Sequence, residues 1–128
     1  MVLMNMVERS GGEQVDRALV RLDRGEVSVS RADAESMRRA LLRYLERPGA
    51  MTREDQLTEL RTSPADIDAD GVVRVGGWLL EGRDDRLVWT ESLQQGSMLH
   101  VTVAYLEPAS GGAWRVSAMD TEQVPLEP

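Results

Sequence analysis

The sequence predicts a single α+β domain in which three N-terminal helices precede a four-stranded antiparallel meander. Apolar residues recur every three to four positions before Ser63 and at alternate positions after Gly71, so helical periodicity gives way to strand periodicity. Short turn sequences separate the alternating stretches, which is typical of neighbouring antiparallel strands. We therefore assign a helical part to residues 13–62 and a sheet part to residues 72–123.

The length of 128 residues and the 41% hydrophobic content are those of one folded domain with one core, which we place at residues 13–124. Residues 1–12 are expected to form a flexible N-terminus and residues 125–128 a tail. Because Glu8 follows the apolar start at once and no basic residue precedes it, we expect no signal peptide.

The first helix is expected after Ser10-Gly11-Gly12, with Gly25 as its C-cap. Its apolar stripe consists of Val15, Ala18, Leu19 and Leu22. Residues 26–30 alternate valine and serine, which indicates either an extended connector or a short strand.

Two capping signals predict the next two helices. Ser30 with Asp33 opens the second helix, and Thr52 with Asp55 opens a short third helix that ends before Pro64. The apolar side chains of these two helices are Ala34, Met37, Leu41, Tyr44, Leu45, Leu57 and Leu60.

Four strands follow. Residues 72–80 are rich in β-formers and are interrupted by Gly76-Gly77, which indicates a bulge or bend. The second strand begins at Leu87 after a turn at residues 82–85. Residues 98–105 show the clearest alternation, and a loop at 108–112 leads into the last strand.

Charge is distributed unevenly between the two halves. Residues 1–62 hold equal numbers of arginines and carboxylates, whereas residues 63–128 hold eleven carboxylates and four arginines, so the second half accounts for the net charge of −7. An acidic surface of this kind favours a basic partner. It also makes nucleic acid an unsuitable one.

Missing residue types exclude several chemistries. The chain has no cysteine, and all 15 of its basic residues are arginine. Disulfides, thiolate catalysis, lysine Schiff bases and P-loop phosphate binding are therefore excluded. These features, with no apolar run long enough for a membrane span, favour a cytoplasmic protein without a cofactor or a membrane partner.

Asp66, Asp68 and Asp70, followed by Gly71, match the start of an EF-hand calcium loop. Position twelve of such a loop needs a bidentate carboxylate, but here it is Gly77. The alternative is an acidic turn leading into a strand. Calcium binding through these three carboxylates is kept as a minor hypothesis.

Residues 40–60, with a hairpin tip at residues 82–86, resemble the outline of winged-helix DNA-binding regulators. That resemblance implies a recognition helix where this chain has three aspartates and three glycines, which would repel phosphate. A fold of this type that has lost DNA binding, or a mimic of DNA charge, stays an alternative.

The stretch from His100 to Tyr105, with residues 112–116, resembles the last strands of nuclear-transport-factor-like and ketosteroid-isomerase-like domains. Such cone-shaped domains enclose a ligand or mediate association. Since His100 is the single histidine, a histidine-dependent enzyme of this class would have to use it. The competing interpretation is that His100 is structural.

From these observations we favour a non-catalytic interaction module, comparable to an immunity protein, a secretion chaperone or an inhibitor, that docks on a basic protein. A homodimer through the sheet or a helix face is a further alternative. Trp78, Trp89 and Trp114 are expected in the core, or at an interface if they face outward. The expected partner-binding residues are Asp66, Asp68, Asp70, Glu81, Asp84, Asp85 and Glu91.

Overall fold

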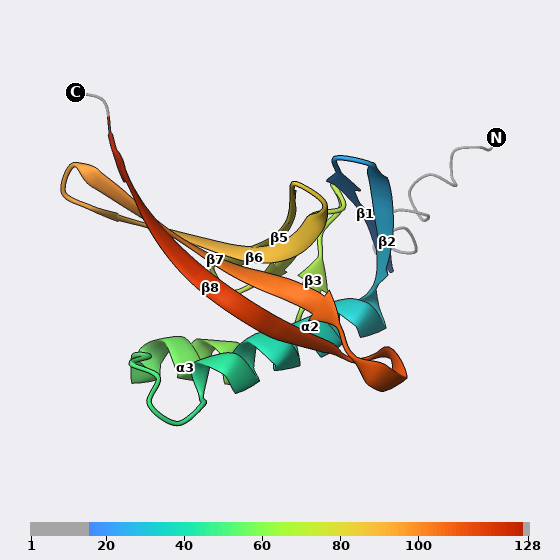
Figure 1. Ribbon diagram of the computed structural model, residues 1–128, viewed down its shortest axis with the longest axis horizontal. Helices are drawn as coiled ribbons and strands as arrows, with labels where there is room; N and C mark the ends of the chain where they lie inside the picture. Colours follow the sequence, from blue (N-terminus) through green and yellow to red (C-terminus); the bar gives the residue numbers. More distant parts are fainter. Residues whose placement is uncertain (1–15, 127–128) are drawn as a thin grey trace.

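The computed structural model describes residues 16–126, which form two α-helices and eight strands in two antiparallel sheets (Figure 1). The predicted flexible N-terminus, residues 1–12, lies outside the described residues. The elements in chain order are β1 (Arg17–Leu22), β2 (Gly25–Ser30), α2 (Arg31–Leu45), α3 (Glu54–Thr62), β3 (Asp66–Ile67), β4 (Val73–Val75), β5 (Trp78–Arg83), β6 (Arg86–Gln95), β7 (Met98–Pro108), the short 3-10 helix η1 (Ser110–Gly112) and β8 (Trp114–Pro125).

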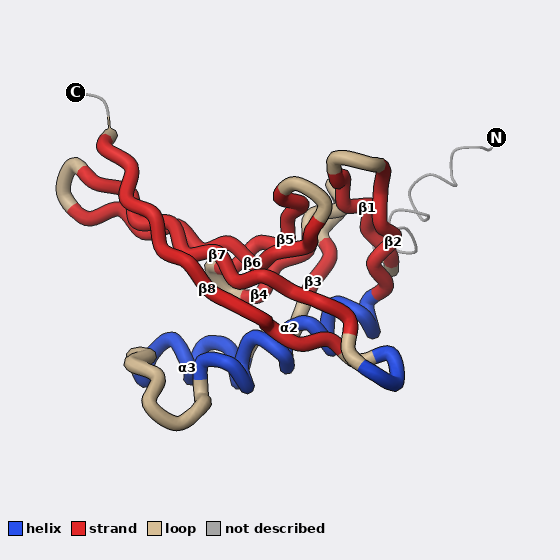
Figure 2. Tube along the Cα trace, in the orientation of Figure 1, coloured by secondary structure: helices blue, strands red, loops and turns tan. Residues whose placement is uncertain are grey.

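The larger sheet is a six-stranded meander in the order β3-β4-β5-β6-β7-β8, and every neighbouring pair is antiparallel. Both helices lie on one side of it, as Figure 2 shows most clearly. The second sheet is the β1–β2 hairpin, which stands beside β5. The fold is therefore mostly sheet, with one layer of helices.

The prediction of a first helix ending at Gly25 was wrong, because Arg17–Leu22 forms strand β1, which pairs with β2 in a hairpin. The start of that predicted helix, up to Val15, lies outside the described residues. Ala18 and Val20 point inward and are buried, whereas Leu19 between them is 65% exposed. Helical and strand periods both fit this stretch, and a helix of about ten residues is marginal by itself. Pairing of Ala18 with Val29 buries both side chains, so tertiary contacts decide for the strand.

The prediction of four strands was also wrong, because the sheet has six. Gly76 and Gly77 form a turn between β4 and β5 rather than a bulge within one strand, with Gly76 at φ 55°. β3, a strand of two residues, lies inside the acidic segment that was assigned to a loop, where Asp66 pairs with Arg74. With two residues in β3 and three in β4, both strands are too short to carry a periodic signal.

The second predicted helix is confirmed as α2, and its capping box is present: the Ser30 side chain accepts from the Asp33 amide while the Asp33 carboxylate accepts from the Ser30 amide. The third is present as α3, but its N-cap is Arg53 and has no side-chain cap. Thr52 instead donates its hydroxyl to the Leu45 carbonyl at 2.9 Å. Thr52 therefore fastens the loop to the end of α2.

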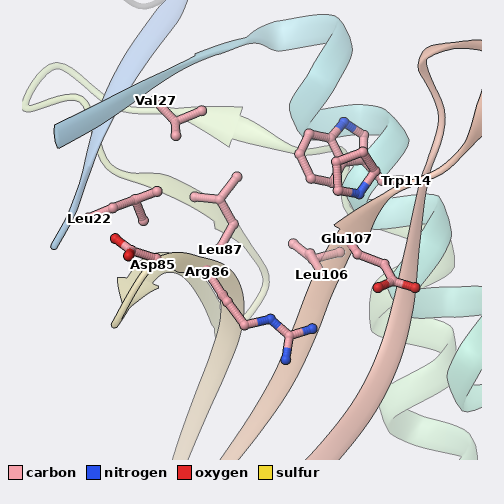
Figure 3. A pocket seen from close by; sticks show the side chains of 9 residues that line it. Leu22, Val27, Asp85, Arg86, Leu87, Leu106, Glu107 and Trp114 are labelled. Atoms are coloured by element: carbon pink, nitrogen blue, oxygen red, sulfur yellow. The ribbon is translucent and has the colours of Figure 1, made fainter. Parts of the chain in front are cut away.

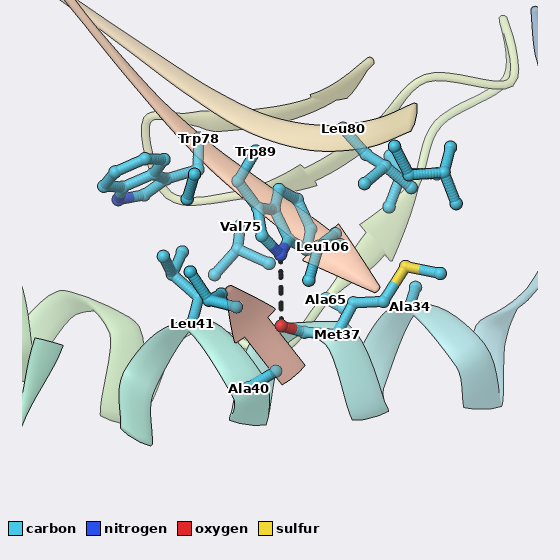
Figure 4. Close-up of a cluster of buried hydrophobic side chains, with 14 of the residues drawn as sticks. Ala34, Met37, Ala40, Leu41, Ala65, Val75, Trp78, Leu80, Trp89 and Leu106 are labelled. Atoms are coloured by element: carbon cyan, nitrogen blue, oxygen red, sulfur yellow. Dashed lines mark hydrogen bonds between the residues drawn. The ribbon is translucent and has the colours of Figure 1, made fainter. Parts of the chain in front are cut away.

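The core lies between the sheet and α2 (Figure 4). Trp78 and Trp89 are fully buried there with Met37 and Leu41. The Trp89 Nε1–H donates to the Met37 carbonyl oxygen at 3.1 Å, which satisfies the indole that burial removes from water. Two large indoles thus provide much of the core volume in a chain without phenylalanine.

A close backbone approach holds the hairpin against the meander. At Gly82 in β5, a Cβ atom would lie 2.0 Å from the Arg21 carbonyl oxygen of β1, so only glycine fits without a backbone shift. The β5–β6 turn adds two hydrogen bonds, from the Asp23 amide to the Asp84 carbonyl and from the Arg24 amide to the Asp85 carboxylate, both at 2.9 Å. This clamp fixes β1 to β5 and β6.

Candidate functional site

The seven carboxylates expected to bind a partner do not form one cluster. Asp66, Asp68 and Asp70 lie at the short β3–β4 edge, Asp84 and Asp85 in the β5–β6 turn, and Glu91 on the helix-covered face of β6. Since they occupy different faces and edges, the acidic second half does not present a single surface through these residues.

Asp68 organises its own turn. Its Oδ1 accepts from the Asp70 amide at 2.9 Å and the Val72 amide at 3.1 Å, while its Oδ2 lies 3.4 Å from Arg74 Nε. The hydrogen bond from the Val72 amide, followed by those from Asp70 and Arg74, lowers the pKa of the Asp68 carboxyl. The carboxylate serves as a backbone acceptor, as is common for Asp in turns.

Asp66 points to a different partner, since its Oδ1 lies 3.6 Å from an Arg31 guanidinium nitrogen. Within residues 16–126, no three His, Asp or Glu side chains lie close enough to hold a metal ion. The three aspartates that suggested calcium binding therefore do not form a metal site among the described residues.

Asp85 belongs to the clamp of the β1–β2 hairpin, because its second oxygen also lies 2.9 Å from Arg24 Nε. Asp84 beside it adopts a left-handed conformation with φ 57°, which Asp tolerates better than most residues. Glu81 is exposed on β5 and lines an open groove of about 600 Å³ with Asp70. Two arginines, Arg21 and Arg74, line the same groove and offset its charge.

Glu91 is half-buried and accepts a hydrogen bond from Gln56 Nε2 at 2.9 Å. Burial is the main cause that raises the pKa of its carboxyl, and the nearby Glu59 and Asp55 add to it. The Gln56 hydrogen bond and the charge of Arg53 oppose this shift without reversing it. Glu91 therefore joins the sheet to α3 and is poorly placed to meet a partner.

His100 lies on the helix-covered face of β7, opposite Leu93 of β6 and Gln123 of β8. It is half-exposed near the tip of the β6–β7 hairpin. It lines neither the groove beside Glu81 nor the two hollows described in the next paragraphs. The interior between α2 and the sheet is filled by side chains rather than hollow. Because this interior is packed, it does not support the hypothesis of a cone-shaped ligand site around His100.

A hollow of about 540 Å³ with a largely apolar lining lies between the β1–β2 hairpin and the ends of β7 and β8 (Figure 3). Leu22, Val27 and Leu87 line one side, and Leu106 and Trp114 the other.

The charged groups at the rim of this hollow already have intrachain partners. Asp85 binds Arg24, Glu107 binds Arg115, and Arg86 donates to Ser117 Oγ at 2.9 Å. Because its charged groups are engaged within the chain, the hollow is suited to an apolar group.

A smaller hollow of about 280 Å³ lies where the α2–α3 loop approaches the sheet, and it includes Arg47, Met51 and Thr121. Met51 is 97% exposed there. The Arg47 guanidinium stacks on the Tyr44 ring at 3.9 Å and donates to the Tyr44 carbonyl, so this cation is also engaged.

The opposite face of the large sheet has a different character, and no described element covers it (Figure 1). We call it the helix-free face. Strand register places Val88 and Val103 at its centre, and both are fully buried although they lie outside the main core. The side chains that share this face are Leu79, Glu81, Arg83, Arg86, Thr90, Ser92, Leu99, Val101, Tyr105, Ala118, Asp120, Glu122 and Val124.

Most charges on the helix-free face neutralise one another. Arg83 pairs with Glu122 at 3.0 Å, and the Arg86 guanidinium stacks on Tyr105 at 4.9 Å. Asp120 makes no ion pair within residues 16–126 and stands exposed on β8. Val88 and Val103 are 1% and 0% exposed, so the centre of this face offers no open apolar surface.

The ends of the three longest strands leave the helix layer (Figure 1). We call residues 92–101 of β6 and β7, together with residues 120–125 of β8, the projecting end. Leu93 is 44% and Val124 43% exposed, on opposite faces. Its charged side chains are Asp120 and Glu122, with no arginine. The sequence did not single out either carboxylate as a candidate site residue.

No family model, curated protein or solved structure matches the chain. None of the described helices is long and apolar enough to cross a membrane. A function for this chain is therefore inferred from the geometry of the described residues.

Proposed function

We propose that this chain is a non-catalytic protein-interaction domain that docks on a basic protein partner through the projecting end of its sheet. One observation carries the proposal: three strands extend beyond the helices with apolar side chains on both faces and carboxylates as their sole charges. Apolar surface left open beside a carboxylate that makes no ion pair within residues 16–126, as at Asp120, is characteristic of a surface that is covered on binding. Glu122 beside it already pairs with Arg83 at 3.0 Å.

The structure narrows the set of carboxylates that a partner could use. Asp68, Asp85 and Glu91 hold backbone or side-chain partners of this chain, so they contribute to folding. Asp70 and Glu81 remain as a secondary acidic site beside Arg74. We assign the primary acidic site to Asp120 on β8, with Glu122 beside it in an ion pair with Arg83.

This assignment determines which charge reversal is informative. Reversing Asp84 and Asp85 would break the contact with Arg24 and disturb the hairpin, so loss of binding would be ambiguous. Asp120→Arg removes a carboxylate that makes no ion pair with the described residues. Asp23→Arg, in the β1–β2 turn at the other end of the molecule, makes the same change of charge and is the matched control.

The test is co-purification from native-host extract, followed by affinity measurement with the retained protein. We expect a protein of basic isoelectric point whose affinity falls steeply between about 50 and 500 mM salt. We expect Asp120→Arg to weaken it by about tenfold while Asp23→Arg changes it little. Retention of nothing, retention of a neutral or acidic protein, or equal binding by both variants would overturn the proposal.

A further inference from the structure

The two edges of the six-stranded sheet are unequal. β3 at one edge has two residues, whereas β8 at the other has twelve. Every residue of β8 from Asp120 to Pro125 is exposed. Natural sheets usually shorten or cover such an edge because its unpaired amides and carbonyls can pair with another strand.

The direction of the β8 backbone groups follows from one hydrogen bond. The Leu126 amide donates to the Ser97 carbonyl at 2.8 Å, toward β7, and directions alternate along an antiparallel strand. Asp120 and Glu122 therefore point their amides and carbonyls toward β7. Met119, Thr121 and Gln123 point theirs to the open edge.

The side chains along this edge differ between the two faces. Asp120 and Glu122 extend on the helix-free face, while Met119, Thr121 and Gln123 extend on the other. A second copy pairing antiparallel about this segment would bring carboxylates together, which is unfavourable. A strand with cations at alternate positions would instead place one cation opposite Asp120 and one opposite Glu122, where it competes with Arg83 for the carboxylate.

We propose, building on the proposed function, that the partner supplies an extended basic segment that adds to the sheet as an antiparallel strand along β8. Its backbone pairs with Met119, Thr121 and Gln123 at hydrogen-bonded positions. Its basic side chains lie opposite Asp120 and Glu122, at the non-hydrogen-bonded positions where side chains are closest. Backbone pairing provides affinity and the two carboxylates select the charge.

The probe is a capped peptide with the core Val-Arg-Val-Arg-Val, tested by calorimetry against the full chain. Its valines would pair with Met119, Thr121 and Gln123. We expect N-methylation of the valines to abolish binding, because the methyl groups block the amides that face β8. N-methylation of the arginines, whose amides face away, should leave the affinity within about twofold.

Substitutions at two positions of β8 test the same geometry. Thr121→Pro removes an outward amide without breaking a bond to β7, and proline is tolerated on an edge strand at such a position. We expect it to reduce peptide affinity at least about tenfold, whereas Thr121→Ala should not. Asp120→Arg should weaken the arginine peptide and strengthen one with glutamate in place of arginine.

The outcomes separate this inference from the proposed function. Peptide binding that ignores valine N-methylation would overturn strand addition and leave basic docking in place. No peptide binding would overturn strand addition, while basic docking is decided by co-purification. Amide exchange of the free chain tests two other occupants of the edge. Protection of the edge amides that increases with protein concentration would identify a second copy as the occupant. Protection that does not change with protein concentration would identify residues 1–15. Either result would overturn the inference.

Discussion

Trp89 and Leu93 lie on the same strand and the same face, four residues apart, yet their surroundings differ. Trp89 is fully buried against α2, whereas Leu93 is 44% exposed beyond the helices. The covered part of the sheet owes its stability to packing. The projecting end adds strand length and apolar surface without a covering layer. This difference separates the residues that hold the fold from those available to a partner.

The largest expected effect compares these two positions directly. Trp89→Ala removes a buried indole and its bond to Met37, and should lower the free energy of unfolding by about 3–5 kcal/mol. Leu93→Ala should lower it by less than about 1 kcal/mol, because little buried contact is lost. Urea denaturation measures both. Similar losses at the two sites would show that the projecting end is part of the core.

A second prediction concerns the clamp between β1 and β5. Gly82→Ala forces a shift at the Arg21 carbonyl and should cost about 1–3 kcal/mol in the free energy of unfolding. Gly77→Ala is the control, since the new Cβ atom would lie at an ordinary 3.8 Å from Glu91 Oε2. Equal stability of the two variants in urea denaturation would contradict a clamp at Gly82.

The smallest effect is a difference in pH dependence between two glutamates. Burial raises the pKa of the Glu91 carboxyl, so its stabilising contribution is present at low pH and lost as pH rises through that pKa. The Arg38 hydrogen bond lowers the pKa of the Glu35 carboxyl, so its contribution is present above the unfolded pKa and lost as pH falls.

Glu91→Gln should therefore increase stability at pH 7 relative to the parent chain, and Glu35→Gln should decrease it. Thermal unfolding from about pH 3 to pH 7 tests both signs. A stability loss in Glu91→Gln at pH 7 would mean that Glu91 is stabilising in its charged form.

The sequence predicted α2 correctly, because a capping box and a long apolar stripe agree with each other. It also predicted the alternation of β7. It failed at β1, where Ala18, Leu19 and Leu22 fit a helix while Ala18 and Val20 fit a strand. The contact with β5 that decides between them comes from residues far along the chain.

The acidic residues of β8 were not predicted as a candidate site, for a related reason. Val116 and Ala118 share the same parity along β8, yet Val116 pairs with Leu106 on the core face and Ala118 with Tyr105 on the helix-free face. An irregularity in the register between Tyr105 and Leu106 causes this change. Alternation alone therefore could not show which face Asp120 would occupy, and charge counting drew attention to the turn aspartates instead.

The central claim is that β8 presents an open, acidic edge in the free protein. Residue-resolved amide exchange by NMR on the full chain tests it most directly. We expect the amides of Met119, Thr121 and Gln123 to exchange rapidly and those of Asp120 and Glu122, which point to β7, to exchange slowly. Slow exchange at all five amides would contradict the claim, because the edge would then already be covered.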